Sequence, residues 1–124
     1  SADSGLAREL VRRGFPGVHV STEVGLGENL AAGMQGTISA SLNITLPFVR
    51  RALADPSSDA DAAVAGIRAH LIRHSLVWAV KTALFTKTGD IAWSRLAPPD
   101  RAPPMSDRKA FLQGLCQLQA AGAS

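Results

Sequence analysis

Only two short stretches of this chain have the pattern of β-strands, and a helical stretch separates them. The strand-like segments are "VHVS" at 18–21 and "GTISA" at 36–40, and residues 23–32 between them have helical spacing up to Gly33. A strand–helix–strand unit predicts two parallel, neighbouring strands joined by a right-handed crossover. Because two strands do not form a stable sheet alone, the pattern also predicts that the unit belongs to a larger fold.

Helical patterns occupy most of the remaining chain. They predict a helix between Asp3 or Ser4 and Gly14, and helices over residues 45–54, 59–87 and 106–120. We expect Pro47 in the first turn of its helix, where its missing N–H costs little, and we expect Gly89 to end one long uninterrupted helix. Alternating helices and strands with short joints are typical of an α/β fold with a parallel sheet.

The composition favours a single globular domain and excludes several classes of protein. The chain has 124 residues, of which 46% are hydrophobic and 19% charged. No apolar run approaches the roughly 20 residues of a membrane span, and the N-terminus does not resemble a secretory signal. The single cysteine, Cys116, cannot form an internal disulfide, and we expect it to be a small core residue of a cytoplasmic protein that has no membrane partner.

The basic residues do not form the pattern of a nucleic-acid-binding surface. The net charge is +3, and the densest pairs, at 12–13 and 50–51, lie at the ends of expected helices, where cations complement the helix dipole. Aromatic residues make up 5% of the chain and tyrosine is absent, so a platform for stacking bases is not expected. We therefore expect no nucleic-acid partner.

Two further groups of residues are candidates for ligand sites. His70 and His74 are four residues apart in "HLIRH", but the glutamate of a zinc-protease helix and a third ligand are missing, so no metal site is expected. Trp78 and Trp93 are expected to be packing residues rather than surfaces for a ligand.

Five segments, taken together and in order, resemble a known family. They are "ADSG" at 2–5, "VHVSTE" at 18–23, "GMQGTISASLNITLP" at 33–47, "VKTALFTKTGD" at 80–90 and "RLAPP" at 95–99. The chain resembles the C-terminal part of the dihydrodipicolinate synthase / N-acetylneuraminate lyase family of class I Schiff-base aldolases and lyases.

The resemblance implies both a fold and an activity. The implied fold is the C-terminal portion of a (β/α)8 TIM barrel, with strands seven and eight in residues 1–56 and a helical extension in residues 57–124. The implied activity is that of a lyase or aldolase that forms a Schiff base with pyruvate or a related 2-keto acid. The family's reaction requires no metal and no organic cofactor.

The resemblance also assigns three substrate-binding residues. Ile38 would line the pocket and present its backbone carbonyl, and Ser39 would leave room for the substrate. Thr22 follows strand seven, at a place where many family members have glycine. From the residues alone another interpretation stays open, in which the small side chains around Ser39 only allow a helix to pack close to the strand.

The catalytic groups of the family are missing from this chain. The Schiff-base lysine of the family lies just before the segment that resembles "ADSG", and the proton-relaying tyrosine has no counterpart here. Lys81, Lys87 and Lys109 lie in expected helices. We therefore expect an inactive fragment that needs a missing N-terminal half or a swapped protomer, in a homo-oligomer. The alternative is a non-catalytic helical and βα interaction module that forms a homodimer.

Overall fold

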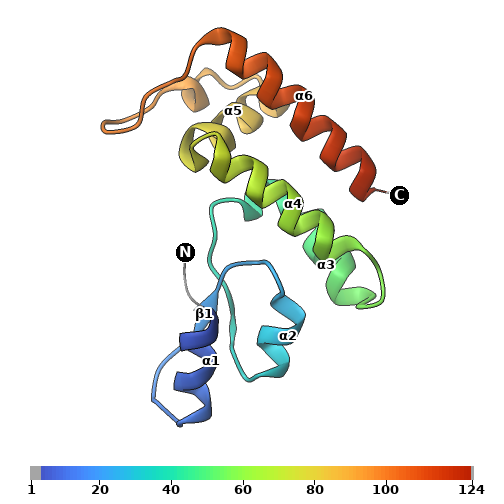
Figure 1. Cartoon of the computed structure of the whole chain (residues 1–124). Helices are drawn as coiled ribbons and strands as arrows, with labels where there is room; N and C mark the ends of the chain where they lie inside the picture. The colour runs from blue at the N-terminus through green and yellow to red at the C-terminus, as the bar shows by residue number, and fades with distance from the viewer. Residues whose placement is uncertain (1–3, 124) are drawn as a thin grey trace.

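Helices form most of the computed structural model, which describes residues 4–123 (Figure 1). The part that we call the N-terminal layer contains α1 (Ser4–Arg12), β1 (Val20–Ser21), α2 (Leu26–Ala31) and β2 (Gly36–Thr37). The helical part contains α3 (Leu42–Ala54), α4 (Ala60–Arg73), α5 (Leu76–Thr88), the 3-10 helix η1 (Ile91–Ser94) and α6 (Met105–Gly122). Asp3, the alternative boundary expected for this first helix, lies outside the described residues.

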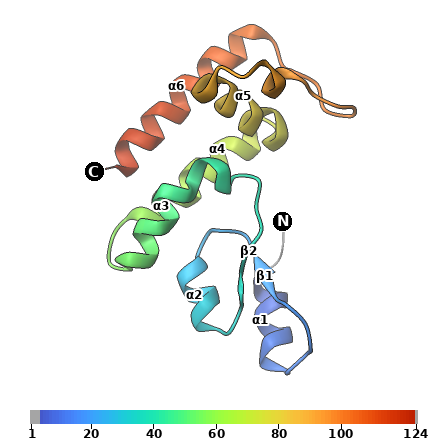
Figure 2. The ribbon, with the colours of Figure 1, turned by 180° about the vertical axis from the view of Figure 1, so that it is seen from behind.

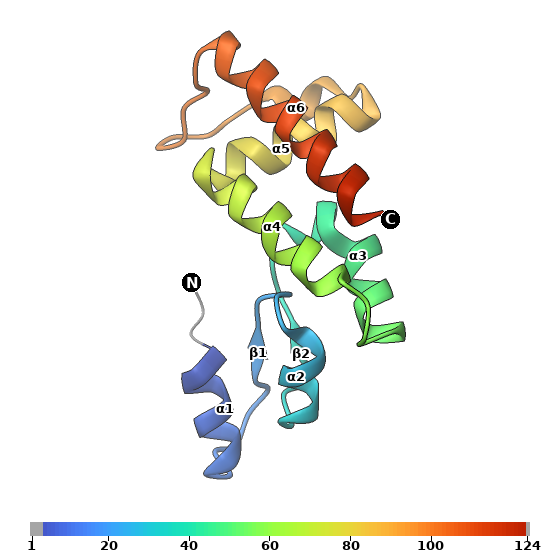
Figure 3. The same ribbon diagram turned by 45° about the vertical axis from the view of Figure 1, so that its right-hand side comes forward.

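The two strands are parallel neighbours, as the sequence pattern predicts. Val20 pairs with Gly36 and Ser21 pairs with Thr37, while α2 connects the strands. Figure 3 shows β1 and β2 side by side, below the helical part. Each strand has only two residues, which is shorter than the expected segments 18–21 and 36–40.

The expected fold class is wrong. Within residues 4–123 the chain is a small helical domain with a two-stranded parallel sheet, and it is not a barrel portion with strands seven and eight. The core lies between the helices, where the side chains of Val64, Ile67, Leu71 and Phe111 are fully buried. Apolar area is buried there because the helices carry apolar faces, whereas the glycine, serine and threonine of the strands offer little such area.

The expectation of a single long helix over residues 59–87 is also wrong. The chain breaks it into α4 and α5 at His74 and Ser75, and Ser75 has a φ of 67°. The break turns α5 back toward α6, so that the rings of Trp78 and Phe111 lie 5.1 Å apart. Apolar spacing continues through the break without a glycine or proline to mark it, and the pattern therefore gave no signal of the turn.

Close packing of α4 against α6 forms the centre of the helical part, and the two helices lie side by side in Figure 1. His70 packs directly over Gly114, and its Nε2 atom lies 2.9 Å from the backbone oxygen of Phe111.

Cys116 is exposed, so the expectation that it lies in the core is wrong. The division of the chain at residues 56 and 57 stays a prediction.

Helix α3 begins at Leu42, three residues before the expected start, and therefore places Pro47 inside the helix. Thr45 Oγ1 donates a hydrogen bond of 3.1 Å to the backbone oxygen of Ser41 in its first turn. None of the helices in the described residues has the length and apolar character needed to cross a bilayer.

Candidate functional site

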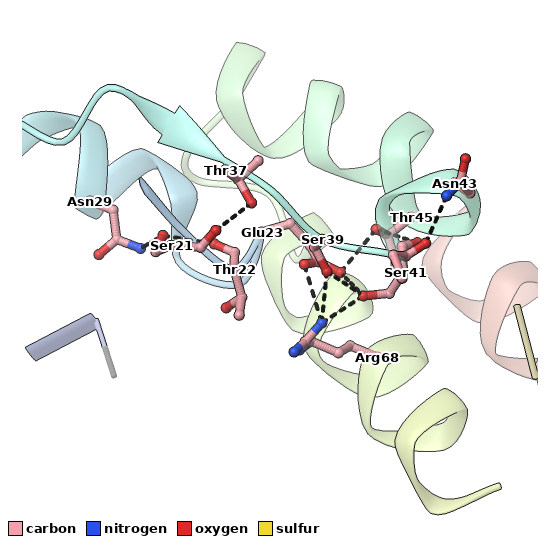
Figure 4. Close-up of polar contacts among 11 residues, drawn as sticks. Ser21, Thr22, Glu23, Asn29, Thr37, Ser39, Ser41, Asn43, Thr45 and Arg68 are labelled. Atoms are coloured by element: carbon pink, nitrogen blue, oxygen red, sulfur yellow. Dashed lines mark hydrogen bonds and ion pairs between the residues drawn. The ribbon is translucent and has the colours of Figure 1, made fainter. Parts of the chain in front are cut away.

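The carboxyl ends of β1 and β2 meet at the boundary between the N-terminal layer and the helical part (Figure 4). Thr22 and Glu23 follow β1, and Ile38 and Ser39 follow β2. Ligands of α/β proteins commonly bind where parallel strands end, because loops and helix termini gather polar groups there. This edge is therefore the place to look for a site.

A buried carboxylate lies at the centre of this edge. Glu23 has no exposed surface, and its Oε1 atom accepts hydrogen bonds from Ser41 Oγ and, at 3.4 Å, from Thr45 Oγ1. Its Oε2 atom lies 3.4 Å from Arg68 Nη1. The two hydroxyl groups come from the start of α3 and the guanidinium from α4, so the carboxylate of Glu23 links three elements.

Arg68 also binds the two serines of this edge. Its Nη1 atom donates hydrogen bonds to Ser39 Oγ at 2.9 Å and to Ser41 Oγ at 2.6 Å, and the two hydroxyl oxygens are 2.8 Å apart. We call Glu23, Ser39, Ser41, Thr45 and Arg68 the strand-end cluster. Because its members come from both parts of the chain, the cluster joins the N-terminal layer to the helical part.

The environment of Glu23 keeps its carboxylate ionised. Burial by itself would raise its pKa, but hydrogen bonds from Ser41, Ser39 and the backbone of Glu23, with the positive charge of Arg68, lower the pKa below its usual range. A glutamate with a lowered pKa is a poor proton acceptor at neutral pH. The cluster is thus suited to holding charge in place rather than to transferring protons.

One edge of the Arg68 guanidinium forms no hydrogen bond with the described residues. Among the described residues, all hydrogen bonds of this side chain use Nη1, and neither Nε nor Nη2 is a buried atom without a partner. In Figure 4 a second nitrogen of Arg68 points away from the dashed contacts. A guanidinium with two free N–H groups on one edge has the geometry to bind a carboxylate with both oxygens.

The three expected substrate-binding residues lie at this edge, but the structure brings only Ser39 into the cluster. Ile38 has 79% of its surface exposed, and its backbone N–H donates to the backbone oxygen of Ser21 at 3.1 Å. Thr22 is partly exposed, and its backbone oxygen accepts a hydrogen bond of 2.9 Å from Ser21 Oγ. No contact tests their assignment to a substrate.

The sequence patterns do not mark Glu23, Ser41 or Arg68 as functional residues. A signal was present for Arg68, because it follows Val64 by four residues and precedes Leu71 by three, which places a cation on the buried face of α4. Glu23 lies two residues after the end of a strand, in a region that often carries functional side chains. Ser41 is a small residue two positions after Ser39, and its place in the sequence does not show its contact with Glu23.

The other titratable residues considered in the sequence lie elsewhere. The ring centroids of His70 and His74 are 4.8 Å apart, and both rings pack on Phe111. Burial, followed by the charges of His70 and Arg73, lowers the pKa of His74. Within residues 4–123 no three His, Cys, Asp or Glu side chains form a group that could hold a metal ion. The three lysines lie in α5 and α6.

Comparison with known proteins does not identify a family for this chain. No family model matches the chain, and searches of curated proteins and of solved structures found no match either.

Proposed function

We propose that this chain supplies the carboxylate-binding part of a lyase or aldolase that forms a Schiff base with pyruvate or a related 2-keto acid. Arg68 binds the carboxylate of the keto acid through Nε and Nη2. Thr22, Ile38 and Ser39 lie around the bound acid at the strand ends. The lysine and tyrosine of the reaction come from polypeptide outside this chain.

The open edge of the Arg68 guanidinium is the observation that carries the proposal. The side chain has 14% of its surface exposed, and its contacts with Glu23, Ser39 and Ser41 fix its orientation before a ligand arrives. A fixed arginine loses little conformational entropy when it binds a carboxylate. The resemblance of the sequence to the Schiff-base lyases supports a keto acid as the source of that carboxylate.

Titration of the isotopically labelled chain with pyruvate tests this proposal by nuclear magnetic resonance. We expect saturable shifts of the Arg68 side-chain Nε–H signal and of the Ser39 amide, with a dissociation constant on the order of 1–10 mM for a single ion-paired contact. The substitution Arg68→Lys removes the paired N–H donors but keeps the charge, and we expect it to weaken binding about tenfold.

Arg73→Lys provides the matched control, because Arg73 is exposed at the C-terminal end of the same helix. The control variant should bind pyruvate as the unchanged chain does. Equal loss in both variants, or shifts that do not saturate, would each contradict the proposal. Borohydride should trap no pyruvate adduct on this chain alone, because its lysines lie in α5 and α6, away from the strand ends.

A homodimeric interaction module is the second candidate function, and the surface of the N-terminal layer favours it. Four apolar side chains there have 60% or more of their surface exposed: Leu6, Phe15, Val18 and Ile38. Within the described residues β1 and β2 pair only with each other, so each strand has an edge that another strand could pair with. An apolar surface beside free strand edges is suited to association with a second copy.

A further inference from the structure

A small pocket in the helical part combines aromatic walls with two cations. Its walls include Trp78 and Phe85 of α5 and Trp93 of η1. Figure 2 shows η1 and the segment after it beside α5 and the start of α6. Trp78 is buried, whereas Trp93 has 37% of its surface exposed. The pocket thus has one buried aromatic ring, that of Trp78, and a second, partly exposed ring, that of Trp93, against which a ligand could pack.

The two cations of this pocket come from different helices. Lys81 lies in α5 and donates a hydrogen bond to the backbone oxygen of Arg95. Arg108 lies in α6, with its Cζ atom 5.1 Å from the centroid of the Phe85 ring. Within residues 4–123 neither cation forms an ion pair, and none of the described residues that line the pocket is acidic. The positive charge therefore favours an anionic ligand.

The size of the pocket limits that ligand to about one ring. Its volume is about 100 Å³. Sites for drug-sized ligands measure roughly 300–1,000 Å³, and an apolar cavity of roughly 150 Å³ holds benzene. The pocket is smaller than both, so at most one aromatic ring of a ligand enters it, with the charged group outside the ring at the cations.

We propose that this pocket binds a small aromatic monocarboxylate. The ring lies against Trp78 and Trp93, and the carboxylate accepts hydrogen bonds from Arg108 and Lys81. The site is separate from the strand-end cluster, so its occupation does not depend on the function proposed above. Stacking on Phe85 restricts the motion of the Arg108 guanidinium, which leaves its N–H groups available to a carboxylate.

Intrinsic fluorescence reports directly on this pocket, because Trp78 and Trp93 are the two tryptophans of the chain. We expect phenylacetate to change the tryptophan emission saturably, with a dissociation constant on the order of 1 mM. The uncharged analogue 2-phenylethanol should bind about tenfold more weakly, because it lacks the charged group that accepts these hydrogen bonds. Acetate, which lacks the ring, should cause no saturable change.

The variant Arg108→Gln should weaken phenylacetate binding about tenfold. Lys109→Gln is its matched control, because this cation is adjacent on α6, exposed, and does not line the pocket. Equal affinities for phenylacetate and 2-phenylethanol, the absence of saturation with phenylacetate, or equal effects of the two variants would overturn the proposal. Circular dichroism checks that both variants fold. If either variant does not fold, the comparison of phenylacetate with 2-phenylethanol and acetate on the unchanged chain still tests the proposal.

Discussion

The carboxylate of Glu23 holds the end of β1 to α3 and α4 through contacts that depend on its negative charge. Glu23→Gln keeps the shape of the side chain and removes the charge. At pH 7 we expect the free energy of unfolding to fall by about 1–3 kcal/mol, because Arg68 and the hydroxyl donors lose a charged acceptor. Urea unfolding of the two proteins measures this difference.

The difference in unfolding free energy between the unchanged protein and Glu23→Gln should decrease as the pH falls. The folded pKa of Glu23 is lowered, so its contribution to stability is complete above the unfolded pKa of about 4.3 and is lost as the pH falls through the folded value. The difference between the unchanged protein and Glu23→Gln should therefore shrink below about pH 4. Glu28→Gln, at an exposed glutamate, should show a small difference at every pH. A difference for Glu23→Gln that does not change with pH would show that its charge is unimportant.

Ser75 joins α4 to α5 in a conformation that favours glycine. Its φ is 67° and its ψ is 103°, and its side chain makes no capping hydrogen bond to α5. Ser75→Gly should therefore raise the free energy of unfolding by about 1 kcal/mol, because the relief of backbone strain exceeds the entropic cost of glycine. Thermal melts measure the effect. Ser106→Gly, in the first turn of α6, should lower the melting temperature instead, and the same sign for both would contradict the explanation.

At the scale of elements, the contact of α4 with α6 depends on a glycine. A Cβ atom added at Gly114 would lie 2.6 Å from Cε1 of His70, whose ring is buried and held against Phe111. Although alanine favours helix, Gly114→Ala should lower the free energy of unfolding by about 1–3 kcal/mol through overpacking. Gly66→Ala, which meets only Leu118 at 3.7 Å, should raise it by up to about 1 kcal/mol. Stabilisation by both changes in denaturant melts would mean that the helices pack less closely.

Elements with a local signal in the sequence were predictable, and those fixed by distant contacts were not. The helical pattern over residues 106–120 indicated α6, and Gly89, with a φ of 71°, ends a helix at the expected place. The turn at Ser75 was missed because contacts of Trp78 with Phe111 favour it against the local helical pattern. Ser39 was recognised as a small residue, but its partner Arg68 is 29 residues away, and sequence spacing does not show that contact.

At the scale of the whole molecule, the fold consists of a well-packed helical part and an N-terminal layer with little apolar burial. Leu26 and Met34 are the buried apolar residues of the layer among those described, whereas Val18 and Ile38 have 77% and 79% of their surface exposed. Arg8 of α1 ties the layer together with a hydrogen bond of 2.8 Å to Asn29. Association with a partner would stabilise this layer, because burying apolar area contributes roughly 25 cal/mol per Å².

Sedimentation over a range of concentrations tests whether that partner is a second copy of the chain. We expect reversible dimers, and we expect the double substitution Val18→Thr with Ile38→Thr to weaken dimerisation at least about tenfold, which corresponds to about 1.4 kcal/mol. Threonine keeps the β-branched shape that suits strands and removes part of the apolar surface, so the monomer should stay folded.

The control is Ile72→Thr with Val77→Thr, since both residues are exposed apolar side chains of the helical part. This pair should leave the dimer unchanged, because it lies outside the N-terminal layer and its strand edges. A chain that sediments as a monomer at every concentration would contradict self-association, as would an equal weakening by both pairs. Weakening by the first pair alone would assign the dimer contact to the N-terminal layer, which also carries the strand ends. Because Arg68 lies at those strand ends, a carboxylate titrated into the same sample would then show whether binding at Arg68 changes the dimerisation constant.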